Sequence, residues 1–152
     1  MKIPMSHFRI FFCTFDAKIQ TKRINQQNIM LEKGLKATSK VVVSEENTAR
    51  VMGSGDMAVF ATPAMVALME NAAMTAVAAE LPEGSTTVGS EMNCSHIKPS
   101  KLGATITATA VLTAVEGRKL TFTVGASDEQ GIIGEGVHVR FVVDRERFMA
   151  KL

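Results

Sequence analysis

The 152-residue sequence contains neither tryptophan nor tyrosine and only two cysteines. Without Trp and Tyr it lacks the usual side chains for stacking nucleic-acid bases, and its net charge of +2 comes with no basic stripe that could follow a phosphate backbone. Cys13 and Cys94 stand far apart without a CxxC motif, so they indicate neither a disulfide framework nor a metal site. We therefore expect a cytoplasmic protein with no nucleic-acid partner.

Long apolar runs are also absent. No stretch of about 18 apolar residues occurs, so the sequence predicts neither a membrane-spanning helix nor a membrane partner. Hydrophobic residues nevertheless make up 46% of the chain and charged residues 21%. This balance is typical of one folded domain with a buried core.

The first 29 residues differ in character from the rest. An apolar cluster at residues 10–15 follows Lys2, but no small-residue cleavage site comes after it, which disfavours a secretory signal peptide. A polar run at 20–27 then leads to Met30, where ordinary globular composition begins. We predict that residues 1–29 are an upstream extension, disordered or not native, and that 30–152 form the folded domain. An extra helix or an anchor is the alternative for the extension.

One segment has the pattern of a helix that is buried on most sides. Thr62 is predicted as the N-cap and Pro63 as the first helical residue, where the missing N–H costs nothing. Residues 64–81 then consist largely of Ala, Met, Val, Leu and Glu and end before Pro82. Because apolar residues occupy every face, the pattern predicts a helix wrapped by the rest of the protein.

Several stretches alternate apolar and polar residues, as strands do. Residues 36–43 and 48–52 are predicted as short strands, and three longer ones follow, separated by turns at 116–117 and 128–131. The predicted apolar faces of the long strands are Ile106, Ala108, Ala110, Leu112 and Ala114, then Leu120, Phe122, Val124 and Ala126, then Val137, Val139, Phe141 and Val143. Antiparallel strands with one apolar face must bury that face against another element. The fold class expected is therefore α+β, a curved antiparallel sheet wrapped around a central helix.

Three polar side chains are candidates for chemistry. Glu70 interrupts the apolar helix, where a partly buried carboxylate suits a general base and a solvent-facing one has no such role. His96 is of the residue type that most often transfers protons near neutral pH, although a lone histidine is more often structural. Thr62 is by default a cap, yet the helix start beside it offers free N–H groups for a thioester oxyanion.

Together these positions resemble the fluoroacetyl-CoA thioesterase family of the hot-dog superfamily. The resemblance is carried by Thr62-Pro63-Ala64-Met65-Val66-Ala67-Leu68-Met69-Glu70, by Val88-Gly89-Ser90, and by His96 with Pro99 and Gly103 after it. It runs from about residue 35 to 143. It implies a hot-dog fold and a homodimeric hydrolase that converts a small or medium acyl-CoA to free acid and CoA, with no cofactor beyond the CoA of the substrate.

The resemblance also implies site residues. Thr62, Glu70 and His96 take the catalytic positions, and Gly89 and Arg140 the substrate-binding ones. The hydrophobic lid of the fluoroacetyl-specific member has no counterpart, because residues 53–56 read Gly-Ser-Gly-Asp. The resemblance therefore leaves the acyl group open.

Helix geometry adds a constraint of its own. Eight residues along a helix span about 12 Å, so Thr62 and Glu70 of one chain reach the same carbonyl only if the helix entry bends back. Otherwise a second subunit contributes one of them, which makes a dimer the simplest expectation. No His/Cys/Asp cluster has ligand spacing, so no metal is expected.

Two other functions remain open from the sequence. An enoyl-CoA hydratase or dehydratase would need an Asp placed ahead of His96, which the sequence lacks at a suitable distance. A non-catalytic acyl-CoA-binding module would leave Glu70 without a role. The candidates for binding the CoA phosphates, which are otherwise ordinary solvated charges, are Lys98, Lys101, Arg118 and Lys119.

Overall fold

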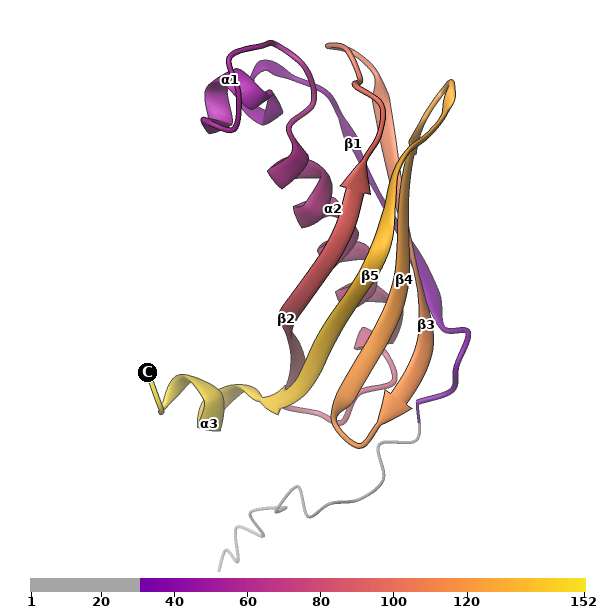
Figure 1. Ribbon diagram of the computed structural model, residues 1–152. Helices are drawn as coiled ribbons and strands as arrows, with labels where there is room; N and C mark the ends of the chain where they lie inside the picture. The colour runs from indigo at the N-terminus through magenta and orange to yellow at the C-terminus, as the bar shows by residue number, and fades with distance from the viewer. Residues whose placement is uncertain (1–30) are drawn as a thin grey trace, which may run out of the picture.

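The computed structural model describes residues 31–152, so the predicted extension at 1–29 lies outside the described residues. The elements in chain order are β1 (Lys36–Val42), η1 (Glu45–Asn47), α1 (Ala49–Met52), α2 (Thr62–Ala78), β2 (Ser85–His96), β3 (Thr105–Glu116), β4 (Lys119–Asp128), β5 (Gly131–Asp144) and α3 (Arg145–Met149). The strands form one antiparallel sheet in the order β1-β3-β4-β5-β2. Helix α2 lies along one face of this curved sheet and contacts all five strands (Figure 1). The predicted α+β architecture is confirmed.

Strands β3 and β4 form the centre of the sheet and carry its core face. Their alternating residues Ile106, Ala108, Ala110 and Leu112, and Leu120, Phe122, Val124 and Ala126, are all buried, as predicted. The alanines of β3 let α2 approach closely, and the larger side chains fill the space around them. Burying a side chain such as Phe122 contributes about 2–3 kcal/mol to folding, so this face is the main source of stability.

The N-cap of helix α2 lies one residue earlier than predicted. Its N-cap is Ala61, whose side chain makes no capping hydrogen bond, and Pro63 lies in the first turn. The prediction of Thr62 as N-cap is therefore wrong, and the Thr62 hydroxyl is available for another partner. The helix buries one stripe, Met65, Met69, Ala72, Ala73 and Val77.

The prediction that α2 is wrapped on most sides is also wrong for the single chain. Ala67 and Met74 are exposed. In the sequence every face of this helix looks apolar because alanine is frequent in it. Alanine favours helix whether it is buried or exposed, so it does not show which face is covered. The other described residues therefore leave one face of α2 uncovered.

Strand β5 turns the opposite way from the prediction. Of the predicted apolar face, Val137 is 46% and Phe141 37% exposed and only Val139 is buried, whereas His138, Arg140 and Val142 of the other face are all buried. The pairing of β5 is irregular on both sides, with register shifts at Ala126/Ser127 and at Gly89/Glu91. Alternation predicts that polar residues face solvent, but here two polar side chains face α2 because the protein supplies their hydrogen-bond partners.

The predicted strand at 48–52 is a helical turn instead. Thr48 caps α1 by accepting a hydrogen bond from the Val51 N–H, and Gly53 ends the turn in the left-handed conformation at φ 73°. Threonine at the start and glycine at the end outweigh the weak strand pattern between them. Within residues 31–152, no helix is long and apolar enough to cross a bilayer.

Candidate active site

Thr62 and His96 meet where α2 begins and β2 ends. The Thr62 Oγ1 lies 2.9 Å from the His96 Nδ1, although 34 residues separate them in sequence. Because Thr62 already belongs to the first helical turn, its hydroxyl does not cap the helix and turns to the imidazole instead. A hydroxyl bonded to an imidazole nitrogen is the pairing that activates Ser and Thr nucleophiles or orients water.

The surroundings of His96 keep its ring neutral. Burial lowers the pKa of His96 below its ordinary value, and the backbone of Lys98 opposes part of that shift. The ring meets buried Phe60 edge to face, with centroids 6.4 Å apart. The His96 Nε2 is buried and has no hydrogen-bond partner among the described residues. A neutral imidazole in this place can accept a proton from the Thr62 hydroxyl.

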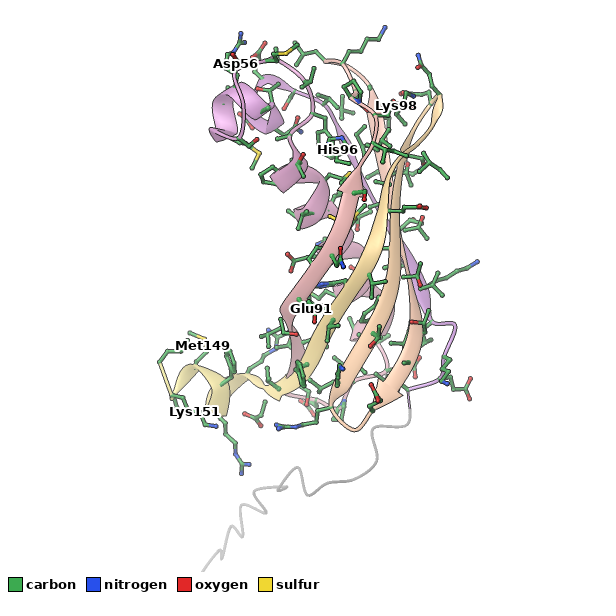
Figure 2. All side chains as sticks on the ribbon, viewed as in Figure 1. Asp56, Glu91, His96, Lys98, Met149 and Lys151 are labelled. Carbon is green, nitrogen blue, oxygen red and sulfur yellow. The ribbon has the colours of Figure 1, made fainter. Side chains whose placement is uncertain are left out.

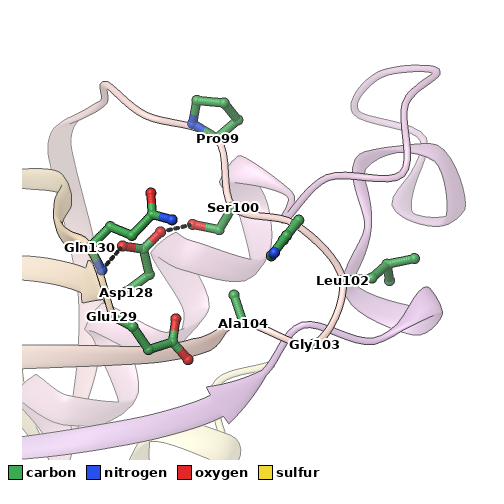
Figure 3. A pocket seen from close by; sticks show the side chains of 9 residues that line it. Pro99, Ser100, Leu102, Gly103, Ala104, Asp128, Glu129 and Gln130 are labelled. Carbon is green, nitrogen blue, oxygen red and sulfur yellow. Dashed lines mark hydrogen bonds between the residues drawn. The ribbon is translucent and has the colours of Figure 1, made fainter.

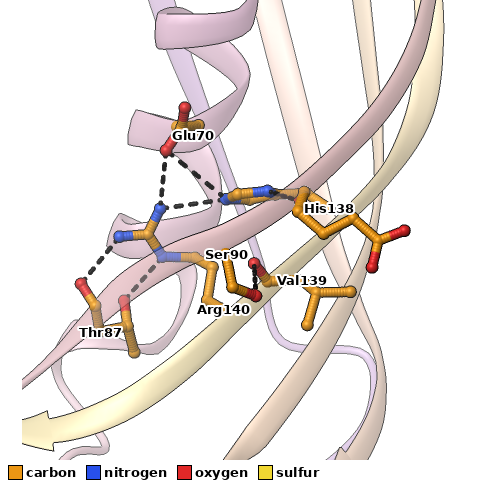
Figure 4. A network of polar contacts seen from close by, with 7 residues as sticks. Glu70, Thr87, Ser90, His138, Val139 and Arg140 are labelled. Carbon is orange, nitrogen blue, oxygen red and sulfur yellow. Dashed lines mark hydrogen bonds and ion pairs between the residues drawn. The ribbon is translucent and has the colours of Figure 1, made fainter.

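Glu70 lies two turns further along α2, in a different set of contacts. Its Oε2 is 3.4 Å from the Arg140 Nη1 and 3.8 Å from the His138 Nε2 (Figure 4). The Glu70 side chain is 41% exposed, so the carboxylate is held from one side and open on the other. A fixed cation on one side and free space on the other suit a carboxylate that handles water or a proton.

Arg140 is held almost completely by protein groups. Its Nε donates to the Thr87 Oγ1 and its Nη2 to the Thr87 carbonyl, both at 2.8 Å. Its Nη1 lies 3.1 Å from the His138 Nε2. Arg140 is only 6% exposed, and burial lowers its pKa while the Glu70 charge opposes that shift. The guanidinium is therefore a rigid support beside the carboxylate.

Gly89 provides the space that this cluster occupies. It pairs with Arg140 across the β2–β5 ladder. A Cβ added at Gly89 would lie 2.8 Å from the Glu70 Oε2 and 3.1 Å from the His138 Cε1. The backbone of Gly89 therefore approaches the carboxylate more closely than any residue with a side chain could.

Within one chain the three predicted catalytic residues form two separate groups. Thr62 and His96 are together, but Glu70 stands beside Gly89, seven residues before His96 on β2. Seven strand residues span about 23 Å. Figure 2 shows His96 and Lys98 towards one end of β2, with Glu91 well below them. No hydrogen bond joins Glu70 to Thr62 or His96 among residues 31–152.

Two members of the Glu70 cluster were not predicted. His138 was missed because β5 was predicted with Val137 facing the helix. Thr87, on β2, was missed because only its hydrogen bonds to Arg140 connect it to the site. The available signal was the spacing of His138 and Arg140, which stand two apart on a strand and so share one face.

Lys98, a candidate for binding CoA phosphates, is engaged elsewhere. Its Nζ lies 3.0 Å from the Asp128 Oδ1, and the Ser100 hydroxyl donates to the same carboxylate. The Lys98 hydrogen bond is the main reason that the pKa of Asp128 is lowered. Ser100 and Asp128 line a pocket of about 520 Å³ together with Lys101 and Glu129 (Figure 3). Its two acidic side chains, Asp128 and Glu129, outnumber its one lysine, Lys101, and this charge balance disfavours a phosphate.

Comparison with known proteins identifies the relatives of this chain. The sequence model of the fluoroacetyl-CoA-specific thioesterases matches residues 43–146. The chain belongs to this family. The fluoroacetyl-CoA thioesterase of Streptantibioticus cattleyicolor is 43% identical over 94 residues, which cover 62% of this chain and 68% of the relative. The resemblance stated from the sequence motifs is confirmed.

Solved structures of the family and of its neighbours share the fold. The fluoroacetyl-CoA-specific thioesterase FlK superposes with a TM-score of 0.74 at 36% identity, covering 80% of this chain and 94% of FlK. A hot-dog-like protein from Thermanaerovibrio acidaminovorans gives a TM-score of 0.74 at 25% identity, covering 82% and 92%. The thioesterase-family chain therefore has the predicted hot-dog fold. Among residues 31–152, no three His, Cys, Asp or Glu side chains group closely enough to hold a metal ion.

Proposed function

We propose that this chain is an acyl-CoA thioesterase that hydrolyses a small or medium acyl-CoA to the free acid and CoA. Within the site, the observation that carries the proposal is the 2.9 Å contact between the Thr62 hydroxyl and a buried imidazole. Membership of a thioesterase family supports the same chemistry. One family structure was solved with fluoroacetate and CoA bound, at 35% identity and a TM-score of 0.73.

The proposed reaction follows from the two groups of residues. His96 takes the proton of the Thr62 hydroxyl or of a water that this hydroxyl orients, and the oxygen attacks the thioester carbonyl carbon. The first turn of α2 offers unpaired N–H groups and the positive end of the helix dipole to the developing oxyanion. The C–S bond then breaks, and the CoA thiolate leaves with the proton that His96 took up. If water attacked, the free acid is released in this step. If Thr62 attacked, an acyl-enzyme remains, and Glu70 acts as general base towards the water that hydrolyses it.

We infer that a homodimer brings Glu70 to the Thr62–His96 pair. Among residues 31–152, strand β2 has a partner on one side only, so its other edge can pair with a second copy. Antiparallel pairing about the middle of β2 sets the His96 end of one strand against the Ser85 end of the other. Measured along the strand direction, His96 then stands about four residues, or roughly 13 Å, from Gly89 of the partner subunit, against seven residues, or about 23 Å, along its own β2.

The helices support the same arrangement. A twofold axis through the paired β2 strands makes the two α2 helices antiparallel. The start of one helix then faces the middle of the other, which places Thr62 towards Glu70 of the partner subunit. The exposed face of α2, with Ala67 and Met74, is the face that a neighbouring copy could cover.

Gly89 and Arg140 have different proposed roles. Gly89 lets the Glu70 carboxylate lie against the backbone of β2, and we propose that the reacting end of the acyl group binds next to this carboxylate. Arg140 is buried and bound to Thr87, so we propose that it acts on the substrate through Glu70, which it orients. The buried support behind Glu70 favours catalysis over a passive acyl-CoA-binding role, because passive binding needs no oriented carboxylate.

The cytoplasm is the proposed compartment. Cys94 forms no disulfide within the described residues and its side chain is half-buried. A thiol that stays reduced fits the cytoplasm better than an oxidising compartment.

Release of free thiol from acetyl-, phenylacetyl- and longer acyl-CoAs tests the proposal. We expect turnover of at least one small or medium acyl-CoA, with loss of activity in His96→Gln. Single-turnover trapping of an acylated Thr62 would assign the attack to its hydroxyl rather than to water. Binding of acyl-CoA without any thiol release would instead indicate a binding module and would contradict the assignment.

A further inference from the structure

His138 is a buried histidine whose two ring nitrogens have fixed partners. It is 1% exposed. Its Nδ1 lies 2.7 Å from the carbonyl oxygen of Glu91, and its Nε2 lies 3.1 Å from the Arg140 Nη1. A carbonyl only accepts hydrogen bonds and a guanidinium only donates them. The ring must therefore carry its proton on Nδ1 and accept from Arg140 through a bare Nε2.

This acceptor determines how Arg140 meets the carboxylate. The Nε and Nη2 of Arg140 donate to Thr87, and one Nη1 hydrogen is directed to His138. Only the Nη1 group then approaches Glu70, at 3.4 Å from Oε2. The usual arginine–carboxylate pair uses two parallel N–H groups and engages both oxygens. Here no hydrogen bond engages the Glu70 Oε1 within residues 31–152.

We infer that His138 is a positioning residue for the reaction. By accepting one hydrogen of the Arg140 Nη1, it keeps the guanidinium from binding both oxygens of Glu70. One carboxylate oxygen thereby stays free for the reacting water or proton. The inference rests on the proposed role of Glu70 as general base.

The charges around His138 support a permanently neutral ring near neutral pH. Arg140 faces its Nε2 directly, and the Glu70 Oε2 lies 3.8 Å from the same nitrogen. Burial is the main cause that lowers the pKa of His138, and the Arg140 charge adds to it, while the Glu91 carbonyl and the Glu70 charge oppose it. A proton on Nε2 would point at a cation and would break the support of Glu70.

Two amide substitutions separate the two hydrogen bonds of His138. In His138→Gln the amide oxygen can take the place of Nε2 and still accept from Arg140. In His138→Asn the shorter amide can replace Nδ1 and donate to the Glu91 carbonyl, but the acceptor for Arg140 is lost. We expect His138→Gln to keep kcat within about threefold of wild type, and His138→Asn to lose about tenfold or more with little change in KM.

The controls distinguish positioning from simple packing. Val137→Thr changes the neighbouring residue on the exposed face of β5 and should leave activity unchanged. Equal losses of kcat in the Gln and Asn variants, or no loss in either, would overturn the inference.

Nitrogen NMR of the wild-type imidazoles gives a readout that does not depend on activity or on a folded variant. The His138 signals should report a protonated Nδ1 and a bare Nε2 from pH 8 to pH 6. An Nε2–H tautomer or an imidazolium at neutral pH would overturn the positioning role. A wild-type enzyme that releases no thiol from any acyl-CoA would overturn the proposed function instead, so the two failures are distinguishable.

Discussion

The start and the middle of α2 carry the two halves of the site, and they are built differently. At the start, Thr62 is exposed and has one side-chain partner, His96, whose other ring nitrogen is without a partner among the described residues. In the middle, Glu70 is backed by buried Arg140 and His138, and Arg140 in turn is fixed by Thr87. All contacts of the Glu70 group come from one chain, whereas no carboxylate lies beside Thr62 and His96 among the described residues.

This difference shows which parts of the chemistry one chain can supply. A rigid, hydrogen-bonded support holds a carboxylate in one orientation without help from another subunit. The hydroxyl–imidazole pair needs only a short contact between α2 and β2. In the proposed dimer, Glu70 of the partner subunit joins this pair, because no described strand covers the outer edge of β2.

The largest predicted effect comes from removing the charge of Glu70. Glu70→Gln keeps the shape and an acceptor for Arg140 but cannot take a proton, so kcat should fall about 10²- to 10⁴-fold. Thermal unfolding should change little, because Arg140 keeps its bonds to Thr87. Thiol release in the steady state measures the effect.

Glu80→Gln is the matched control, since Glu80 is exposed just beyond the end of α2. Activity within a few-fold of wild type in Glu70→Gln would show that the middle of the helix is structural only.

A smaller effect is expected from filling the space beside the carboxylate. In Gly89→Ala the new Cβ would lie 2.8 Å from the Glu70 Oε2, so the carboxyl must shift away from its support. A displaced general base should lose about tenfold in kcat/KM. Gly125→Ala is a matched strand control, because its nearest neighbour is the Gly134 carbonyl at an ordinary 3.8 Å. Full activity in both variants would mean that the position of Glu70 does not matter.

The smallest effect is a dependence of stability on pH. The pKa values of His96 and His138 are lowered in the folded state, mainly by burial, from about 6.5 in the unfolded chain. Below pH 6.5 the unfolded state therefore binds more protons, and the free energy of unfolding should fall as the pH drops towards 5. Asp128 and Glu129 also have lowered pKa values, but their contribution is lost only at more acidic pH.

Urea unfolding at several pH values between 7.5 and 5 measures this dependence. His138→Gln should flatten the slope by at most about 1.4 kcal/mol per pH unit, the limit for one proton. An unchanged slope in that variant would show that other residues, and not His138, cause the pH dependence of the free energy of unfolding.

The sequence predicts the central part of the fold well because apolar and polar residues alternate cleanly there. In β3 and β4 every predicted core residue from Ile106 to Leu112 and from Leu120 to Ala126 is buried. Strand β5 was predicted with the wrong face towards the helix. His138 and Arg140 can be buried because Glu70 and Thr87 provide polar partners for them, and no local sequence pattern reveals these partners. Buried polar residues are thus the main source of error.

The site was predictable in its residues but not in its arrangement. The motif around Thr62 and Glu70, with His96 further on, indicates the chemistry through resemblance to a family. The contact between Thr62 and His96 depends on the packing of α2 against the end of β2, which no residue spacing determines. Glu70 is separated from His96 because it lies beside Gly89, seven residues before His96 on β2. This separation is the physical reason for predicting a dimer.

Complementation between two inactive variants tests most directly whether the site forms across the dimer. Homodimers of Glu70→Gln and of His96→Ala should both be inactive. Co-expressed in equal amounts, they form heterodimers in which one of the two sites is intact, so the mixture should recover about a quarter of wild-type activity. If heterodimers are present by mass spectrometry and no activity returns, the groups act within one chain and the account of the site is wrong.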